Sequence, residues 1–215
     1  MRRTRIKICG LTRPEDAAHA VSSGADALGV VLAPSKRQVT LDQAAEAFAD
    51  VPPLVARIGV FVDASADEVW EAVARLGLTA VQFHGDEAPE TCAAAPVPVI
   101  KAVRVGPGFD RLSVDVYCGS VSALLFDTLV PGGAHGGTGL AFDWHDVAGR
   151  LPDWAPAIVA GGLAPQNVAE AVRVFAPLAV DVSSGVESSP GIKDHALIDA
   201  FCAAVRAADL EVEDR

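Results

Sequence analysis

A thiol and a carboxylate at the ends of two apolar runs are the side chains of this sequence best suited to proton transfer. Cys9 ends the run Arg5–Cys9, and Asp127 ends the run Ala123–Asp127. Taken alone, such a cysteine is usually a small core residue, and such an aspartate is usually a helix cap or a loop residue. If the fold brings both side chains to one opening, they form a plausible base and acid pair.

Further polar residues and small-residue loops follow other apolar runs. Arg37 lies in APSKRQVT, and its planar guanidinium can bind a carboxylate through two hydrogen bonds. His84 directly follows another run, in VQFHGDE, and is a candidate for substrate contact. The loops AGGLAPQNV and SSGVESSPG lead into predicted helix starts, where backbone N–H groups can approach a phosphate closely. The predicted phosphate-binding residues are Gly161, Gly162, Ser184 and Gly185.

These residues lie far apart in the sequence, so the elements between them must bring them together. Short β-branched runs alternate with longer Ala-rich amphipathic runs, which predicts a parallel sheet with helical crossovers. The predicted strands are Arg5–Cys9, Ala27–Val31, Ala56–Phe61, Ala80–Phe83, Val97–Ala102, Ala123–Asp127, Ala157–Ala160 and Ala179–Ser183. Eight such units predict an α/β fold, a single-domain (β/α)8 TIM barrel over residues 1–215, compact beside the usual length of about 250 residues. An open doubly wound sheet is the alternative, but no GxGxxG motif follows the first run.

The predicted helix ends have specific sequence signals. Thr12–Glu15, Thr40–Gln43 and Ser65–Glu68 fit the capping box, in which two side chains satisfy free backbone N–H groups. Gly24 and Gly77 lie where a left-handed residue would end the first and third helices. These signals place helices between the predicted strands.

Side-chain alternation decides which residues line the interior of such a barrel. Ile6 and Ile8 face the helices, so Lys7 and Cys9 face inward, with Cys9 at the C-terminal mouth where active sites of this fold form. The same alternation predicts that five further side chains face inward: Gln82, His84, Lys101, Asp181 and Ser183. Because buried charges must be paired, we expect Lys7, Lys101 and Asp181 to form an interior ion network.

Composition limits the classes of partner. The formal net charge of −11 argues against nucleic-acid binding by a diffuse basic surface, so an anionic ligand must be held by local cations or backbone N–H groups. No apolar run of about 18 residues predicts a membrane span, and the start lacks the apolar segment of a signal peptide. The four cysteines lie far apart without a CxxC pair, which indicates free thiols in a reducing cytoplasm. We expect the acidic stretch 209–215 to fray.

Several motifs, in order along nearly the whole chain, resemble those of the phosphoribosylanthranilate isomerase family of tryptophan biosynthesis. They are KICGLT, PSKRQV, GVFV, VQFHGDE, LLFDT, GGTGLAFDW, AGGLAPQNV and DVSSGVESSPGIKD. The resemblance implies a TIM barrel that converts N-(5-phosphoribosyl)anthranilate to 1-(2-carboxyphenylamino)-1-deoxyribulose 5-phosphate without cofactor or metal. We also expect a small phosphorylated molecule as the binding partner, a cytoplasmic location, and a monomer or homodimer.

The resemblance assigns roles to individual residues. Cys9 matches the general base of the family, Asp127 its general acid, and Arg37 the arginine that holds the anthranilate carboxylate. The family usually has SPR where this chain has Ser35–Lys36–Arg37, and loss of the proline frees the loop backbone. Reference pKa values of about 3.9 for Asp and about 8.5 for Cys oppose these roles. We therefore expect Lys7 to favour the thiolate and a dry mouth to raise the pKa of Asp127.

Two other functions fit parts of the pattern. The sugar-phosphate isomerase of the histidine pathway, or a relative that accepts both substrates, resembles this chain in fold and reaction but usually has Asp at the position of Cys9. A non-catalytic phosphate-binding barrel would keep the phosphate loops without needing Cys9 and Asp127 together. We further expect the glycine-rich loop Gly132–Gly139 to close over a substrate.

Overall fold

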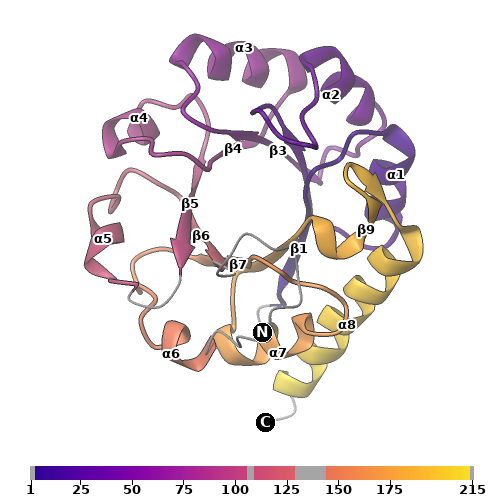
Figure 1. Ribbon diagram of the computed structural model, residues 1–215, viewed down its shortest axis with the longest axis vertical. Helices are drawn as coiled ribbons and strands as arrows, with labels where there is room; N and C mark the ends of the chain where they lie inside the picture. The colour runs from indigo at the N-terminus through magenta and orange to yellow at the C-terminus, as the bar shows by residue number, and fades with distance from the viewer. Residues whose placement is uncertain (1–2, 106–108, 129–143, 214–215) are drawn as a thin grey trace.

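Eight parallel strands close into a barrel in the computed structural model, which describes residues 3–105, 109–128 and 144–213 (Figure 1). The strands are β1 (Arg5–Ile8), β2 (Ala27–Val31), β3 (Ala56–Phe61), β4 (Ala80–Phe83), β5 (Val99–Val105), β6 (Ala123–Thr128), β7 (Ala157–Ala160) and β8 (Ala179–Val182). Each strand pairs with its neighbours in sequence, and β1 pairs with β8 to close the ring. The predicted (β/α)8 barrel is confirmed, and the open sheet is excluded.

Helices surround the barrel as an outer ring in Figure 1. They are α1 (Pro14–Ser22), α2 (Leu41–Ala47), α3 (Ala66–Leu76), α4 (Pro89–Ala93), α5 (Leu112–Asp115), α6 (Trp144–Ala148), α7 (Val168–Phe175) and α8 (His195–Glu213). Between β8 and α8 the chain forms a short 3₁₀ helix, η1 (Ser184–Val186), and a hairpin of β9 (Glu187–Ser189) and β10 (Ile192–Lys193). In the described ranges no helix is long and apolar enough to cross a bilayer.

Local sequence signals explain most element ends. Thr40 and Ser65 form the predicted capping boxes of α2 and α3, and Gly77 ends α3 with φ of +59°. Gly24 has φ of +93°, one residue beyond the C-cap of α1. The fifth strand begins at Val99 rather than at the predicted Val97, because Pro98 cannot donate a hydrogen bond to the sheet.

The prediction of a capping box at Thr12–Glu15 was wrong. Arg13 occupies the N-cap of α1 without a side-chain capping bond, and Pro14 follows in the first turn. A proline there needs no hydrogen-bond partner and already has a helical φ. The Thr12 hydroxyl instead donates to the carbonyl of Gly191 in the hairpin before α8.

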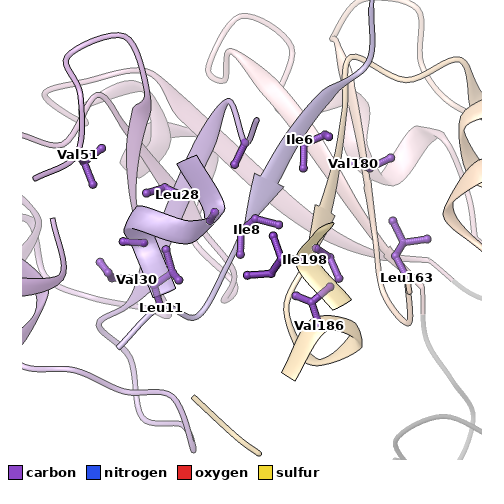
Figure 2. Close-up of a cluster of buried hydrophobic side chains, with 14 of the residues drawn as sticks. Ile6, Ile8, Leu11, Leu28, Val30, Val51, Leu163, Val180, Val186 and Ile198 are labelled. Atoms are coloured by element: carbon purple, nitrogen blue, oxygen red, sulfur yellow. The ribbon is translucent and has the colours of Figure 1, made fainter. Parts of the chain in front are cut away.

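Two apolar layers make up the core. The outer layer lies between strands and helices, and Figure 2 shows part of it, where Ile6, Ile8 and Val180 of the sheet lie near Ile198 of α8. The inner layer fills the barrel with small and branched side chains, among them Ile58, Ile100, Ala102, Leu125 and Ile158. The barrel interior is therefore a packed support for the residues at its two ends, not a pore.

The prediction that Lys101 points into the barrel was wrong. Its neighbours Ile100 and Ala102 belong to the inner layer, and its register partner on β4 is Phe83, which belongs to the outer layer. The Lys101 ammonium donates to Glu87 at 3.0 Å and to the carbonyl of Gly85 at 2.7 Å. The expected single network is thus two separate ion pairs, Lys7–Asp181 inside the barrel and Lys101–Glu87 outside it.

The acidic stretch expected to fray is helical as far as Glu213. Asp209 accepts hydrogen bonds from the backbone N–H and the hydroxyl of Thr4, at 3.0 and 2.7 Å, so the two ends of the barrel chain are tied together.

Loss of one charge from the Lys101–Glu87 pair should strongly destabilise the protein. In Glu87→Gln the ammonium remains buried without its carboxylate, which typically costs about 3–5 kcal/mol of unfolding free energy. Urea denaturation measures this loss. The matched control is Glu90→Gln on the exposed side of α4, expected to change stability by about 0.5 kcal/mol or less. Equal stability of the two variants would contradict the importance of this pair.

Candidate active site

The C-terminal ends of the strands surround a cavity of about 380 Å³. Its lining includes most of the residues predicted from the sequence: Cys9, Arg37, His84, Asp127, Gly161, Gly162 and Ser184. A larger hollow, of about 760 Å³, opens at the opposite end of the barrel and contains none of them. The smaller cavity is the candidate site, because it combines a thiol, two carboxylates, an arginine and residues of both glycine loops.

Cys9 lies just beyond β1 and is fixed by its own backbone. Its N–H donates to the carbonyl of Val182 at 2.8 Å, which extends the β1–β8 pairing into the mouth. The sulfur lies against Gly29 of β2, where an added Cβ would come within 2.9 Å of it. A glycine at this position of β2 therefore leaves the space that the thiol occupies.

Burial raises the pKa of the Cys9 thiol above its ordinary value, although the charges of Lys7 and Lys193 act in the opposite direction. Lys7 is buried and donates to Asp181 at 2.9 Å. Burial lowers the pKa of Lys7, but the Asp181 carboxylate outweighs this and leaves it raised. Lys7 is thus a charged partner of Asp181. It also favours the Cys9 thiolate, as expected, but burial outweighs this effect and keeps the pKa of the thiol raised.

Asp127, near the end of β6, faces the cavity beside His84. Its Oδ2 lies 3.3 Å from His84 Nε2. The other ring nitrogen, Nδ1, lies 3.1 Å from the side-chain nitrogen of Gln82. Because an amide nitrogen only donates, Gln82 in this orientation directs the ring proton to Nε2, on the side of Asp127. His84 therefore directs its Nε2–H toward the Asp127 carboxyl group.

Arg37 reaches the cavity over Gly10, but part of its guanidinium is already occupied. Nε and Nη2 donate to the two carboxylate oxygens of Glu187 at 2.8 and 2.7 Å. Glu187 in turn accepts from Lys193 Nζ at 2.9 Å. Burial would raise the pKa of Glu187, but these two cations keep it low. The binding of a substrate carboxylate by Arg37 stays a prediction, and the Nη1–Nη2 edge is the part of the guanidinium that faces away from Glu187.

Glu187 and Lys193 were not among the predicted site residues. Both lie in the motif DVSSGVESSPGIKD, but the hairpin that brings them to the mouth is too short and polar to be predicted as strands. A pair of charges in a loop is usually solvent-exposed, whereas here the Lys193 and Glu187 side chains are 0% and 4% exposed. Their burial is the signal that only the structure provides.

The two glycine loops meet at the cavity. Gly161 and Gly162 have φ of +84° and +64°, a backbone conformation that glycine adopts without strain. Asn167 holds this loop by accepting from the N–H of Ala164 and donating to the carbonyl of Gly162. Gly185 does not line the cavity, and an added Cβ there would lie 1.9 Å from the carbonyl oxygen of Leu163. Gly185 therefore allows the two loops to pack together.

Within the described ranges, no group of three or more His, Cys, Asp or Glu side chains is arranged to hold a metal ion. The loop Gly132–Gly139, predicted to close over a substrate, lies outside the described residues.

Comparison with known proteins identifies the family. A family model described as N-(5'phosphoribosyl)anthranilate (PRA) isomerase matches residues 6–204. The chain belongs to this PRA isomerase family. A PRA isomerase of Pseudomonas fluorescens is 50% identical over 209 residues, covering 96% of this chain and 100% of that protein. That of Myxococcus xanthus is 49% identical over 209 residues, covering 96% of this chain and 98% of that protein.

Solved PRA isomerase structures agree with the fold. The crystal structure from Thermotoga maritima has a TM-score of 0.83 and 38% identity, covering 95% of this chain and 99% of that chain. A PRA isomerase in complex with reduced 1-(o-carboxyphenylamino)-1-deoxyribulose 5-phosphate has a TM-score of 0.80 and 36% identity, with coverage of 95% and 99%. The resemblance stated from the motifs is therefore confirmed for fold and family.

The raised pKa of Cys9 predicts slow alkylation at neutral pH. Iodoacetamide reacts with the thiolate, so the rate at Cys9 should continue to rise with pH beyond the ordinary thiol pKa of about 8.5. Mass spectrometry of peptides alkylated at a series of pH values measures this rate, with the exposed Cys118 as the internal control for reagent. A rate at Cys9 that levels off below pH 8 would contradict the raised pKa.

Proposed function

We propose that this chain isomerises N-(5'-phosphoribosyl)anthranilate to 1-(2-carboxyphenylamino)-1-deoxyribulose 5-phosphate in tryptophan biosynthesis, with Cys9 as general base and Asp127 as general acid. The observation that carries the proposal is one cavity that unites this thiol, this carboxylate, an arginine edge and two glycine loops. The family to which the chain belongs supports the same reaction.

The reaction is an Amadori rearrangement, in which Asp127 and Cys9 each transfer one proton. Asp127 donates a proton to the ribose ring oxygen while the bond from this oxygen to C1′ breaks, and the anthranilate nitrogen forms a Schiff base. Cys9 reacts from its thiolate form, which its raised pKa makes the minor form at neutral pH. The thiolate removes the proton from C2′, and the electron pair of that C–H bond forms the enolamine. The 2′-hydroxyl of the enolamine then loses its proton to solvent as C1′ gains one, which yields the ketone. Each transfer requires a side chain within hydrogen-bond reach of the reacting atom.

His84 assists the acid in this proposal. Asp127 loses its proton during ring opening and must regain one before the next turnover. The Nε2–H of His84, 3.3 Å from Asp127 Oδ2, orients the carboxylate that remains, and the proton itself returns from solvent. Direct contact between His84 and the substrate stays a prediction, as does the role of Ser184 and Gly185 in holding the phosphate.

Local charge, rather than net charge, attracts the doubly anionic substrate. Lys7 is neutralised by Asp181, whereas Arg37 and Lys193 share the single carboxylate of Glu187. This cluster retains one positive charge at the cavity, although the chain as a whole carries −11. We assign the remaining edge of Arg37 to the anthranilate carboxylate and the loops at Gly161 and Ser184 to the phosphate.

Two buried free thiols, Cys92 and Cys202, fit a reducing cytoplasm.

Both proposed catalytic side chains should be essential. Asp127→Asn removes the acidic proton and Cys9→Ser replaces the base by a far weaker one, so each should lower kcat by about 100-fold or more while the fold is retained. The loss of phosphoribosylanthranilate fluorescence measures turnover, and circular dichroism measures folding. A folded wild-type protein without turnover would favour the histidine-pathway substrate, and phosphate binding alone would favour a non-catalytic barrel.

Gly10 should be required for substrate affinity. Its φ is +75°, and an added Cβ would lie 2.6 Å from Arg37 Cδ and 2.9 Å from Ser183 Oγ. Gly10→Ala should therefore displace Arg37 and raise KM by roughly tenfold, as for loss of one charged hydrogen bond. Gly119→Ala is the matched control, since Gly119 has φ of +83° but nothing within 4 Å of an added Cβ. Equal KM values in the two variants would contradict the role of Gly10 in placing Arg37.

A further inference from the structure

Three charged side chains form a connected cluster beside the cavity: Arg37, Glu187 and Lys193. The side chains are 19%, 4% and 0% exposed. Removing charges from water is costly, and buried ion pairs often contribute little net stability compared with apolar residues of similar size. A cluster of this kind at the mouth of an active site therefore calls for an explanation other than stability.

Lys193 joins three parts of the site. Its ammonium donates to the carbonyl of Cys9 at 2.6 Å, to the carbonyl of Ser183 at 3.1 Å and to Glu187 at 2.9 Å. An ammonium has three N–H groups, so these acceptors use all of them. Lys193 therefore has no donor left for a substrate, and it acts only by holding the groups that it contacts.

Glu187 fixes the direction of Arg37. It occupies the Nε–Nη2 edge of the guanidinium and also accepts from the N–H of Gly191 at 3.3 Å, which ties it to the hairpin. A planar guanidinium held along one edge can present only its other edge, Nη1–Nη2, to a second carboxylate. Gly10 lies close against the Arg37 side chain, since an added Cβ would come within 2.6 Å of Cδ.

We propose that Glu187 and Lys193 are positioning residues that make Arg37 a preorganised, end-on receptor for the carboxylate of the substrate. The inference rests on the proposed function and adds how this chain recognises the aromatic half of its substrate. Two cations share one anion, so the cluster needs one further negative charge, and Arg37 is the member that lines the cavity. Lys193 also links this receptor to the backbone of Cys9, so that base and receptor keep a fixed separation.

The kinetic consequence follows from the chemistry of the substrate. The carboxylate lies on the ring, away from C1′ and C2′, and its charge does not change during the reaction. An interaction that is equal in ground state and transition state affects KM and leaves kcat nearly unchanged. A substitution of Glu187 that weakens the interaction of Arg37 with the carboxylate should therefore raise KM. Loss of the Lys193 contact to Cys9 should also lower kcat.

The test compares two substrates and two matched variants. The substrates are phosphoribosylanthranilate and phosphoribosylaniline, which lacks the carboxylate. Glu187→Gln should raise KM for the first by roughly 10- to 100-fold with kcat within a few-fold, because charge-assisted hydrogen bonds are lost. KM for phosphoribosylaniline should change by less than about twofold. Glu211→Gln is the control, since it breaks an exposed carboxylate pair with Arg173 far from the cavity.

The double variant Arg37→Ala/Glu187→Gln adds a second measure. If Glu187 acts through Arg37, the KM of the double variant should equal the KM of the single variant Arg37→Ala. An equal rise in KM for both substrates in Glu187→Gln, or additive effects in the double variant, would overturn the inference and leave Glu187 a structural residue. Absence of wild-type turnover with phosphoribosylanthranilate would instead overturn the proposed function, so the two failures are distinguishable.

Discussion

The pairing of β1 with β8 is the constraint on which the site depends. Four register pairs align Arg5–Ile8 with Ala179–Val182, and the N–H of Cys9 continues the same ladder. This pairing sets Lys7 opposite Asp181 across a separation of 174 residues. It also places the thiol beside the second glycine loop, where the chain leaves β8. Without closure of the ring, neither the ion pair nor the mouth would exist.

The buried charges of the barrel form separate ion pairs. Inside, Lys7 and Asp181 pair beside the Ala, Ile and Leu side chains of the inner layer. Outside, Lys101 and Glu87 order the chain that follows β4, where Glu87 also accepts from the N–H groups of Asp63 and Gly85. Each pair satisfies itself, so the only unmatched charge of these groups lies at the cavity. An acidic protein can thereby hold an anionic ligand.

Much of the fold could be predicted because its signals are local. Strand and helix alternate regularly, and the caps at Thr40 and Ser65 depend only on residues three positions apart. The direction of Lys101 could not be predicted, because the run around it is apolar on both faces of the strand. Thr12 was misread for a different reason, since its partner Gly191 lies 179 positions away. The catalytic candidates were found because each ends an apolar run.

The charged cluster of the hairpin has a consequence for the order of events during synthesis. Cys9 leaves the ribosome early, but the lysine that holds its carbonyl follows 184 residues later. At a translation rate of about 5–20 residues per second, the N-terminal strand waits for roughly ten seconds or more before that contact can form. Until then the thiol lies in an incomplete barrel with an open edge. The barrel and its active site are therefore completed only when β8 and the hairpin that follows it have been synthesised. A partly synthesised chain can form part of the sheet but has no complete active site.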